Sequence, residues 1–450
     1  MHKYKVISVR IKKQIEEGIY APGARIPSIR DLTNQFDCSK ETVKKALTVL
    51  EQQHLVYARP QSGYYVIESA AIKHENKDEM VYASTSFPNI QTFPYENFEH
   101  CVIQAITTYK ENLFYYTKSR GLPSLLQTMK LNLEEDQIFT KLDHIFMTTG
   151  AQQAIDILSR MPFPNNNQMI LVEQPTFYGA LKAFELNRVP TIGINRDLKG
   201  IDLDELELLF KKKRIKFFYT TPRLHHPVGY SYSKEEMQQI LYLADKYHVY
   251  IVEDDYMADF IDSPKELSMF AYDVYDRVIN IRSFSKIMFP GLRLAATVLP
   301  KVLIDTFQEY KTWTADVNSS VISQGGLDIF IKSGLFSINK ERTRTLHANR
   351  MAYLIQKIEE NQVAGVQFSR PKGGFYLSLY AESGINCKRV YTELLKQKIE
   401  LVDIRGCFLP QFRRNRYIHL STSKLNEETI DWAIPMIMKK VQDNVYPALR

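Results

Sequence analysis

From residue 81 onward the chain alternates short apolar runs with amphipathic segments, and this alternation constrains the fold more than any other feature. The apolar runs that predict strands are residues 145–149, 170–173, 217–221, 250–253, 278–281 and 295–299. Segments with helical spacing lie between them, for example residues 202–212 and 234–247. Such alternation predicts an α/β fold, with a mostly parallel sheet covered by helices on both faces. Functional residues are expected at the carboxyl ends of the strands, where such sheets bind ligands.

The first 67 residues follow a different pattern, which predicts a winged helix-turn-helix. Isoleucines repeat at four-residue intervals in the first helical segment, at positions 7, 11 and 15. Ser28 and Ser39 are placed to cap a second and a third helix, and strand-like runs follow at residues 55–57 and 64–66. Three helices followed by a hairpin are typical of this DNA-binding motif.

Positive charge is concentrated in this first segment. The whole chain carries 58 Lys and Arg against 51 Asp and Glu, a net charge of +7. Residues 1–66 hold eleven basic and six acidic residues, so they account for +5 of that total. A small basic unit on a nearly neutral chain indicates a polyanionic partner. The residues expected to contact double-stranded DNA are Arg30, Ser39, Lys40, Thr42, Lys44, Arg59 and Gly63.

Residues 18–66 resemble the GntR family of bacterial transcription factors. The resemblance rests on three stretches, PGARIPSIR at 22–30, CSKETV at 38–43 and SGYYV at 62–66. It implies sequence-specific binding of DNA by a domain over residues 1–67. Residues 68–80 are polar and poor in large apolar side chains, which predicts a linker to a second domain over residues 81–450.

Residues with reactive or charged side chains lie at the ends of the predicted strands. Lys286 follows one strand beside two serines, and Arg293 lies seven residues further on. A lysine in this setting can form a Schiff base next to a phosphate pocket. Asp254 ends another strand within a run of acids, which are costly to bury without a partner such as a protonated ring nitrogen. The spacing of His, Cys and acidic residues supports no metal site.

Together these residues resemble the fold-type I aminotransferases, over nearly all of residues 87–425. The resemblance implies pyridoxal 5′-phosphate (PLP) as cofactor, with Lys286 as the Schiff-base lysine and Asp254 on the pyridine nitrogen. It implies a homodimer, and a large parallel-rich sheet domain with a small C-terminal α+β subdomain. Phe177 would stack on the ring. The other residues implied for cofactor binding are Tyr256, Ala151, Gln152, Ser283, Ser285, Arg293 and, from the partner subunit, Tyr116.

A GntR-type head on an aminotransferase-like body is the arrangement of the MocR family of transcriptional regulators, which the whole chain resembles. The resemblance implies a head-to-tail homodimer. Four widely spaced cysteines, an N-terminus without an apolar signal core and the lack of a long apolar run predict a cytoplasmic protein with no membrane partner.

The residues expected to face an effector depart from the aminotransferase pattern. His419 stands where those enzymes carry an arginine that clamps the substrate carboxylate, and a neutral imidazole is a poor clamp. Arg416 is close in sequence, but three residues along a strand it points to the opposite face. The loop at residues 221–227 also differs, with His225 and His226. These four residues are the predicted effector pocket.

The cofactor residues fit the aminotransferase pattern while the substrate residues do not, which favours a regulator over an enzyme. We therefore expect a PLP-binding, sequence-specific transcriptional regulator. Its small-molecule effector is PLP itself, as in MocR members that control vitamin B6 synthesis, or an amino acid or amine that forms an aldimine. Two alternatives remain open: an active aminotransferase with a DNA-binding head, and a repressor whose body is a PLP-free dimerisation scaffold.

Overall fold

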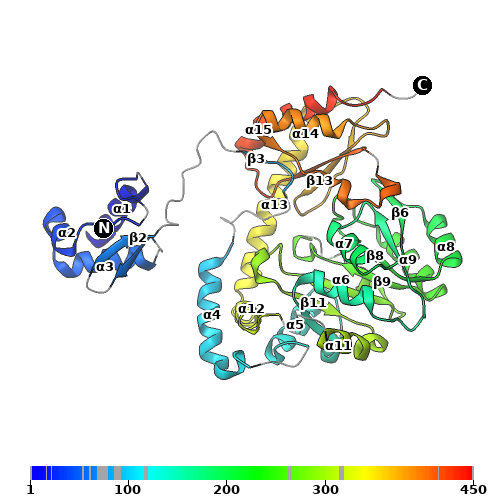
Figure 1. Ribbon diagram of the computed structural model, residues 1–450, viewed down its shortest axis with the longest axis horizontal. Coiled ribbons are helices and arrows are strands. Elements are labelled where there is room, and N and C mark those ends of the chain that lie inside the picture. The colour runs from blue at the N-terminus through cyan, green and yellow to red at the C-terminus, as the bar shows by residue number, and fades with distance from the viewer. Residues whose placement is uncertain are drawn as a thin grey trace. The chain divides into compact units, whose positions relative to one another are not determined.

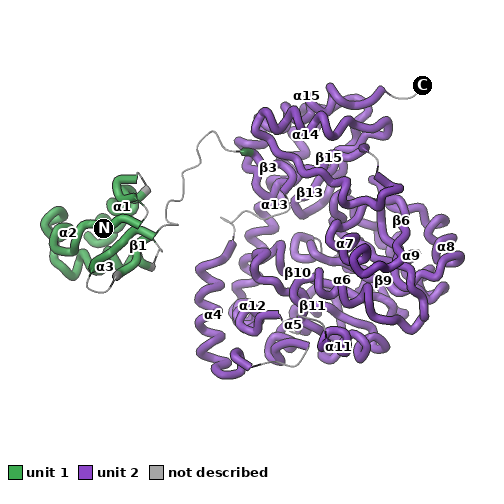
Figure 2. Tube along the Cα trace, in the orientation of Figure 1, with its two compact units in different colours: residues 1–80 green, residues 81–450 purple. Residues whose placement is uncertain are grey.

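The chain forms two compact units, Met1–Met80 and Val81–Arg450, which are described separately (Figure 2). The computed structural model describes residues 3–16, 18–21, 23–52, 55–59, 62–67, 80–85, 93–115, 120–261, 263, 265–313, 319–413 and 415–447. Within these residues no helix is both long enough and apolar enough to cross a bilayer.

The first unit is the predicted winged helix-turn-helix. Its elements are α1 (Lys3–Glu16), α2 (Ile29–Phe36), α3 (Lys40–Gln52) and an antiparallel hairpin of β1 (Val56–Arg59) and β2 (Gly63–Val66). The Ser28 hydroxyl accepts the backbone N–H of Asp31 and completes a capping box at the start of α2. The Ser39 hydroxyl accepts the N–H of Thr42 at the start of α3. One apolar core unites the helices and the hairpin, with Ile7, Ile11, Ile15, Leu32, Val43, Leu47, Leu50 and Val66.

The second unit is built on an eight-stranded sheet (Figure 1). Its strands are β4 (Ile145–Thr148), β5 (Met169–Gln174), β6 (Thr191–Asp197), β7 (Gly200–Ile201), β8 (Ile215–Thr220), β9 (Tyr250–Asp254), β10 (Val278–Ser283) and β11 (Ala295–Val298). Their order is β4-β11-β10-β9-β8-β5-β6-β7. Strands β6, β5, β8, β9 and β10 are parallel, whereas β11 runs antiparallel to both neighbours and β7 to β6. The prediction of a mostly parallel sheet is confirmed, although β6 and β7 were not among the predicted strands.

Helices cover both faces of this sheet because neighbouring residues of each strand point to opposite sides. On β8, Phe217 and Tyr219 pack with α6 (Gly150–Arg160), α7 (Tyr178–Leu186) and α11 (Ile304–Thr312). Phe218, between them, packs on the other face with α8 (Leu203–Lys212), α9 (Lys234–Lys246) and α10 (Met269–Tyr272). A further core joins α4 (Tyr95–Tyr109), α5 (Pro123–Glu135) and α12 (Val321–Lys332).

A small α+β subdomain ends the chain, as expected. It contains an antiparallel sheet of β12 (Gln367–Phe368), β13 (Tyr376–Tyr380) and β15 (Tyr417–Ser421). Helices α13 (Leu335–Glu360), α14 (Cys387–Lys396) and α15 (Glu427–Gln442) pack around it, and Figure 1 shows α13 running to them from α12. The first strand of the unit, β3 (Val81–Tyr82), pairs in parallel with β14 (Ile399–Glu400).

Candidate functional site

One edge of the large sheet collects the predicted cofactor residues. The carboxyl ends of β4, β5, β8, β9 and β10 meet at this edge because these strands point the same way. Asp254 lies beside Ile281, and Ser283 lies opposite Ala295, which in turn lies opposite Thr148. Residues that are far apart in sequence thus come to one edge, where α/β sheets bind their ligands.

Lys286 and Asp254 form the electrostatic centre of this edge. Burial lowers the pKa of Lys286 to about 8, although the Asp254 carboxylate raises it. Burial raises the pKa of Asp254 to about 6, against the opposing effects of the Tyr219 hydroxyl and of Lys286. Tyr219 donates a 2.5 Å hydrogen bond to Oδ2 of Asp254. Oδ1 of the same carboxylate is buried and has no hydrogen-bond partner among the described residues.

The start of α6 offers a cradle for an anion. Gly150 has a φ of +69°, and a Cβ placed there would lie 3.0 Å from a guanidinium nitrogen of Arg293. Arg293 itself donates to the carbonyl oxygen of Thr149 at 3.3 Å. The N–H groups of a helix's first turn, here that of Ala151 among them, have no partner within the helix, and together with the helix dipole and the guanidinium they favour a phosphate. The Ser285 N–H meets the Ser283 hydroxyl at 3.3 Å, on the neighbouring loop.

The aromatic residues predicted to bind the cofactor have different neighbours. Phe177 is 37% exposed and lies over Gly179. A Cβ on that glycine would be 2.6 Å from the phenyl ring and 2.5 Å from the Gln152 amide oxygen, so both side chains lie close to the Gly179 backbone. The Tyr256 hydroxyl donates to the Leu224 carbonyl at 2.9 Å and would have to exchange this acceptor to bond a cofactor oxygen. Tyr116 lies outside the described residues.

Two of the four predicted effector residues meet beside Lys286. His226 and His419 have ring centroids 4.9 Å apart, and both contact Tyr376, at 4.8 and 5.0 Å. Burial lowers the pKa of His419 to about 4, and burial, His419 and Lys286 together hold the pKa of His226 well below its ordinary value. Both imidazoles are therefore neutral at neutral pH. Tyr376 was not among the residues predicted for this pocket.

The other two predicted effector residues turn to different partners. His225 lies against the buried Glu173, with Nε2 and Oε2 3.2 Å apart, because the loop directs consecutive side chains to opposite sides. Arg416 precedes β15 and lies 3.5 Å from the Tyr380 hydroxyl. The prediction that all four residues form one pocket is therefore wrong, and only His226 and His419 of the four lie together.

The first unit brings several of the predicted DNA contacts together. A hollow of about 380 Å³ is lined by Pro27, Ser28, Ile29, Arg30, Lys40, Lys44, Gly63 and Tyr64. Ser39 and Thr42 lie at the start of α3, with their hydroxyls 2.9 Å apart. The backbone of Arg59 pairs with Gly63, but its side chain lies outside the described part of the chain. Arg25 was missed: its guanidinium lies 3.1 Å from where a Cβ on Gly63 would be.

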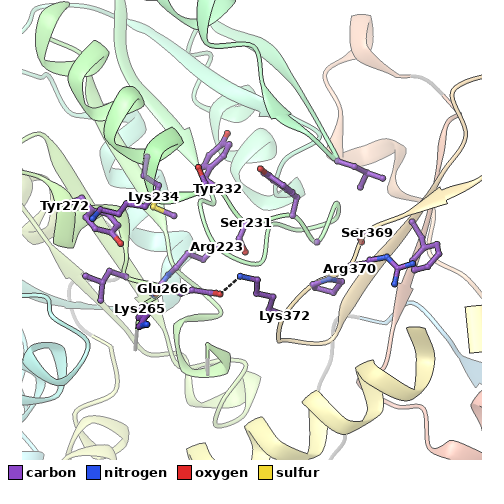
Figure 3. Close-up of a pocket in the computed structure, with 18 residues that line it drawn as sticks. Arg223, Ser231, Tyr232, Lys234, Lys265, Glu266, Tyr272, Ser369, Arg370 and Lys372 are labelled. Atoms are coloured by element: carbon purple, nitrogen blue, oxygen red, sulfur yellow. Dashed lines mark hydrogen bonds and ion pairs between the residues drawn. The ribbon is translucent and has the colours of Figure 1, made fainter. Parts of the chain in front are cut away.

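A separate cavity of about 620 Å³ opens between the loop at residues 229–234 and residues 368–372 (Figure 3). None of the predicted cofactor or effector residues lines it. Three of its cations are already ion-paired, Arg223 with Asp255, Lys372 with Glu266 and Arg370 with Glu359. Its size alone therefore does not make it the functional site.

Comparisons with known proteins agree with both units. Residues 3–66 match the model of the bacterial regulatory proteins of the gntR family, and residues 92–434 match that of the class I and II aminotransferases. The uncharacterized HTH-type transcriptional regulator YcxD of Bacillus subtilis (strain 168) is 38% identical over 442 residues, which cover 97% of this chain and 99% of the relative. The chain belongs to the MocR-like family of transcriptional regulators. It also belongs, through its second unit, to the class I and II aminotransferases.

Other relatives of this MocR-like regulator carry similar descriptions. The HTH-type transcriptional regulator NorG of Staphylococcus aureus (strain USA300) is 24% identical, with 83% of this chain and 90% of the relative covered. Among solved structures, a kynurenine aminotransferase of Pyrococcus horikoshii superposes with a TM-score of 0.75 over 82% of this chain and 92% of its own, at 24% identity. That likeness establishes the fold. This MocR-like protein is thus a DNA-binding transcriptional regulator whose second unit belongs to a PLP-binding family.

Proposed function

We propose that this regulator binds PLP at Lys286 and that the ligand state of its second unit controls how the first unit binds DNA. The observation that carries the proposal is that Oδ1 of Asp254, near Lys286, has no hydrogen-bond partner in the part of the chain that the structure describes. A buried carboxylate oxygen without a partner is costly, and a protonated ring nitrogen would satisfy it. The cofactor supplies an aldehyde that condenses with a primary amine, such as a lysine side chain.

The chain's own residues fit this role. With a pKa of about 8, a larger share of Lys286 is neutral at physiological pH than of an ordinary lysine, and the neutral amine is the nucleophile. Asp254 would hold a proton on the ring nitrogen, and Phe177 would cover the ring. The phosphate would be held by Ser283, Ser285, Arg293 and the backbone N–H groups of Ala151 and Gln152.

We further propose that the second unit senses rather than catalyses. The neutral His226 and His419 support this, since a transaminase must hold the carboxylates of an amino acid and a keto acid. The effector is PLP itself, in which case the regulator would control vitamin B6 synthesis, or an amino compound. A head-to-tail homodimer in the cytoplasm, with the partner subunit's Tyr116 at the phosphate, completes the proposal.

The decisive experiment is a spectral titration with PLP of the full chain and of Lys286→Ala. The wild-type protein should gain the visible absorbance of a bound Schiff base and lose it on borohydride treatment, whereas Lys286→Ala should gain none. Lys216→Ala is a matched control, because burial also lowers the pKa of Lys216 to about 8. Lys216 lies near the start of β8, away from the carboxyl ends of the strands where the cofactor residues gather. A colourless wild-type protein, or an unchanged band in Lys286→Ala, would refute the assignment.

A further inference from the structure

The imidazole pair beside Lys286 has unused hydrogen-bonding capacity. His419 is 1% exposed, and neither of its ring nitrogens has a hydrogen-bond partner among the described residues. The same holds for Nδ1 of His226. The Pro227 carbonyl is close enough to raise the pKa of His419, but neither ring nitrogen makes a hydrogen bond of ordinary geometry within the described residues. Since buried polar atoms normally have partners, these nitrogens indicate a polar ligand group that bonds to the rings.

The pair is also electrically neutral, and Lys286 is the cationic side chain that acts on it. In the PLP-loaded protein that amine would be engaged by the cofactor. Burial lowers the pKa of His226, and His419, Lys286 and His225 lower it further. The buried guanidinium groups of Arg223 and Arg196 are already ion-paired, with Asp255 and Glu173 respectively. Burial opposes the protonation of either imidazole. His419 and Lys286 also oppose the protonation of His226.

These conditions exclude one class of ligand and favour another. A carboxylate placed against this pair would be desolvated and would receive no counter-charge from the two neutral imidazoles, which is unfavourable. A neutral imidazole offers one donor and one acceptor nitrogen, and a hydroxyl can both donate and accept. The pair therefore suits an uncharged polar group better than an acid.

We propose that the amino compound sensed at this site is a primary amine that carries no carboxylate and bears an uncharged polar group, such as a hydroxyl, to meet His226 and His419. This inference rests on the proposed function, since the amine would reach PLP held at Lys286. It assigns the two histidines as specificity-determining residues. Amino acids would then be poor effectors because of their carboxylate.

The test compares ethanolamine with serine, which differ only by the carboxylate, and with ethylamine, which lacks the hydroxyl. Each is titrated into the PLP-loaded full-length protein, and binding is measured by the change in visible absorbance and by calorimetry. Ethanolamine should bind at least about tenfold more tightly than serine, and more tightly than ethylamine. Equal or tighter binding of serine, or no response to any of the three, would overturn the inference.

Two variants show whether the histidine sets this preference. His419→Arg supplies a guanidinium and should shift the ratio of the two affinities at least about tenfold toward serine. His419→Asn keeps a neutral polar group and should retain the preference for ethanolamine. An unchanged ratio in a folded, PLP-loaded His419→Arg protein would contradict the assignment. A wild-type protein that fails to load PLP would overturn the proposed function together with this inference, whereas one that loads PLP and prefers serine would overturn this inference alone.

Discussion

Asp254 carries an electrostatic cost that a bound ring nitrogen would relieve. The pKa of this carboxyl is about 6 in the folded chain, against an ordinary value of 3.8, chiefly because it is buried. The folded state therefore binds the proton more tightly than the unfolded state, so stability falls as the pH rises from about 4 to about 6. Above that range the ionised side chain costs on the order of 3 kcal/mol.

The first prediction follows from this cost. In the PLP-free protein, Asp254→Asn should increase the free energy of unfolding at pH 8 by up to about 3 kcal/mol, and the gain should shrink toward pH 4. The same variant should bind PLP at least about tenfold more weakly, because it cannot hold a proton on the ring nitrogen. Urea unfolding at both pH values and a PLP titration measure the two effects. Wild-type affinity for PLP in the variant would show that Asp254 does not pair with the ring.

At the scale of single elements, α3 presents two neighbouring lysines to different surroundings. Lys44 lines the hollow that also contains Arg30, Lys40 and Gly63. Lys45, the next residue, lies 4.8 Å from the centre of the Tyr4 ring, against α1. The two side chains carry the same charge on the same helix, so they separate the effect of position from that of net charge.

The second prediction uses this difference. Lys44→Ala should weaken binding to all DNA sequences and reduce the slope of log affinity against log salt by about 1, because one phosphate contact is lost. Lys45→Ala should change the slope much less. Fluorescence anisotropy at several salt concentrations gives both slopes. Identical slopes for the two variants would mean that α3 does not lie on the DNA as expected.

The end of β5 holds the loop at residues 221–232 in place through one buried acid, Glu173. It accepts hydrogen bonds from Arg196, Thr220, Tyr232 and the backbone N–H of Thr221, and it lies against His225. Burial alone would raise the pKa of Glu173, but Arg196 and His225 hold it well below its ordinary value. Its contribution to stability is therefore present above about pH 4.5 and is lost as the pH falls further.

The third prediction is that Glu173→Gln lowers the free energy of unfolding of the second unit by about 3–5 kcal/mol at pH 7, because Arg196 is left buried without its carboxylate. Glu207→Gln is the control, since it removes a carboxylate from an exposed pair with Lys246. Its effect should be much smaller. Chemical unfolding followed by tryptophan fluorescence compares them, and similar losses in both variants would contradict a central role for Glu173.

At the scale of the whole molecule, each unit has its own core. In the described residues every apolar cluster lies within one unit, the first around Leu47 and the others from Ala83 onward. The second unit begins with β3, which pairs with β14. The Ala83 N–H next to it donates to the Glu400 carbonyl. The boundary between the units is thus sharp.

The fourth prediction concerns this boundary. A protein that begins at residue 81 should bind PLP as tightly as the full chain and unfold at the same denaturant concentration. A protein that begins at residue 86 should be less stable, because it lacks β3 and the buried Ala83. Loss of PLP binding in the protein that begins at residue 81 would show that the second unit depends on the first.

Much of the site was predictable because its signals are local. Ser28 and Ser39 mark helix starts, and Lys286 and Asp254 each follow an apolar strand, so the sequence alone placed them at strand and helix ends. The six predicted strands are present for the same reason: an apolar run bounded by polar residues leaves few other conformations. The short β7 and the polar β6 lack that signal and were missed.

What the sequence determined by itself was therefore the type and order of the elements and the residues at their ends. The tertiary structure alone decided which side chains face one another. The imidazole pair joins a loop to β15 across nearly two hundred residues, and Tyr219 reaches Asp254 only because β8 and β9 are neighbours in register. His225 and Arg416, which were predicted in one effector pocket with His226 and His419, contact Glu173 and Tyr380 instead. Periodicity is a local property of the backbone, whereas the direction of a side chain toward a distant partner depends on strand order and register.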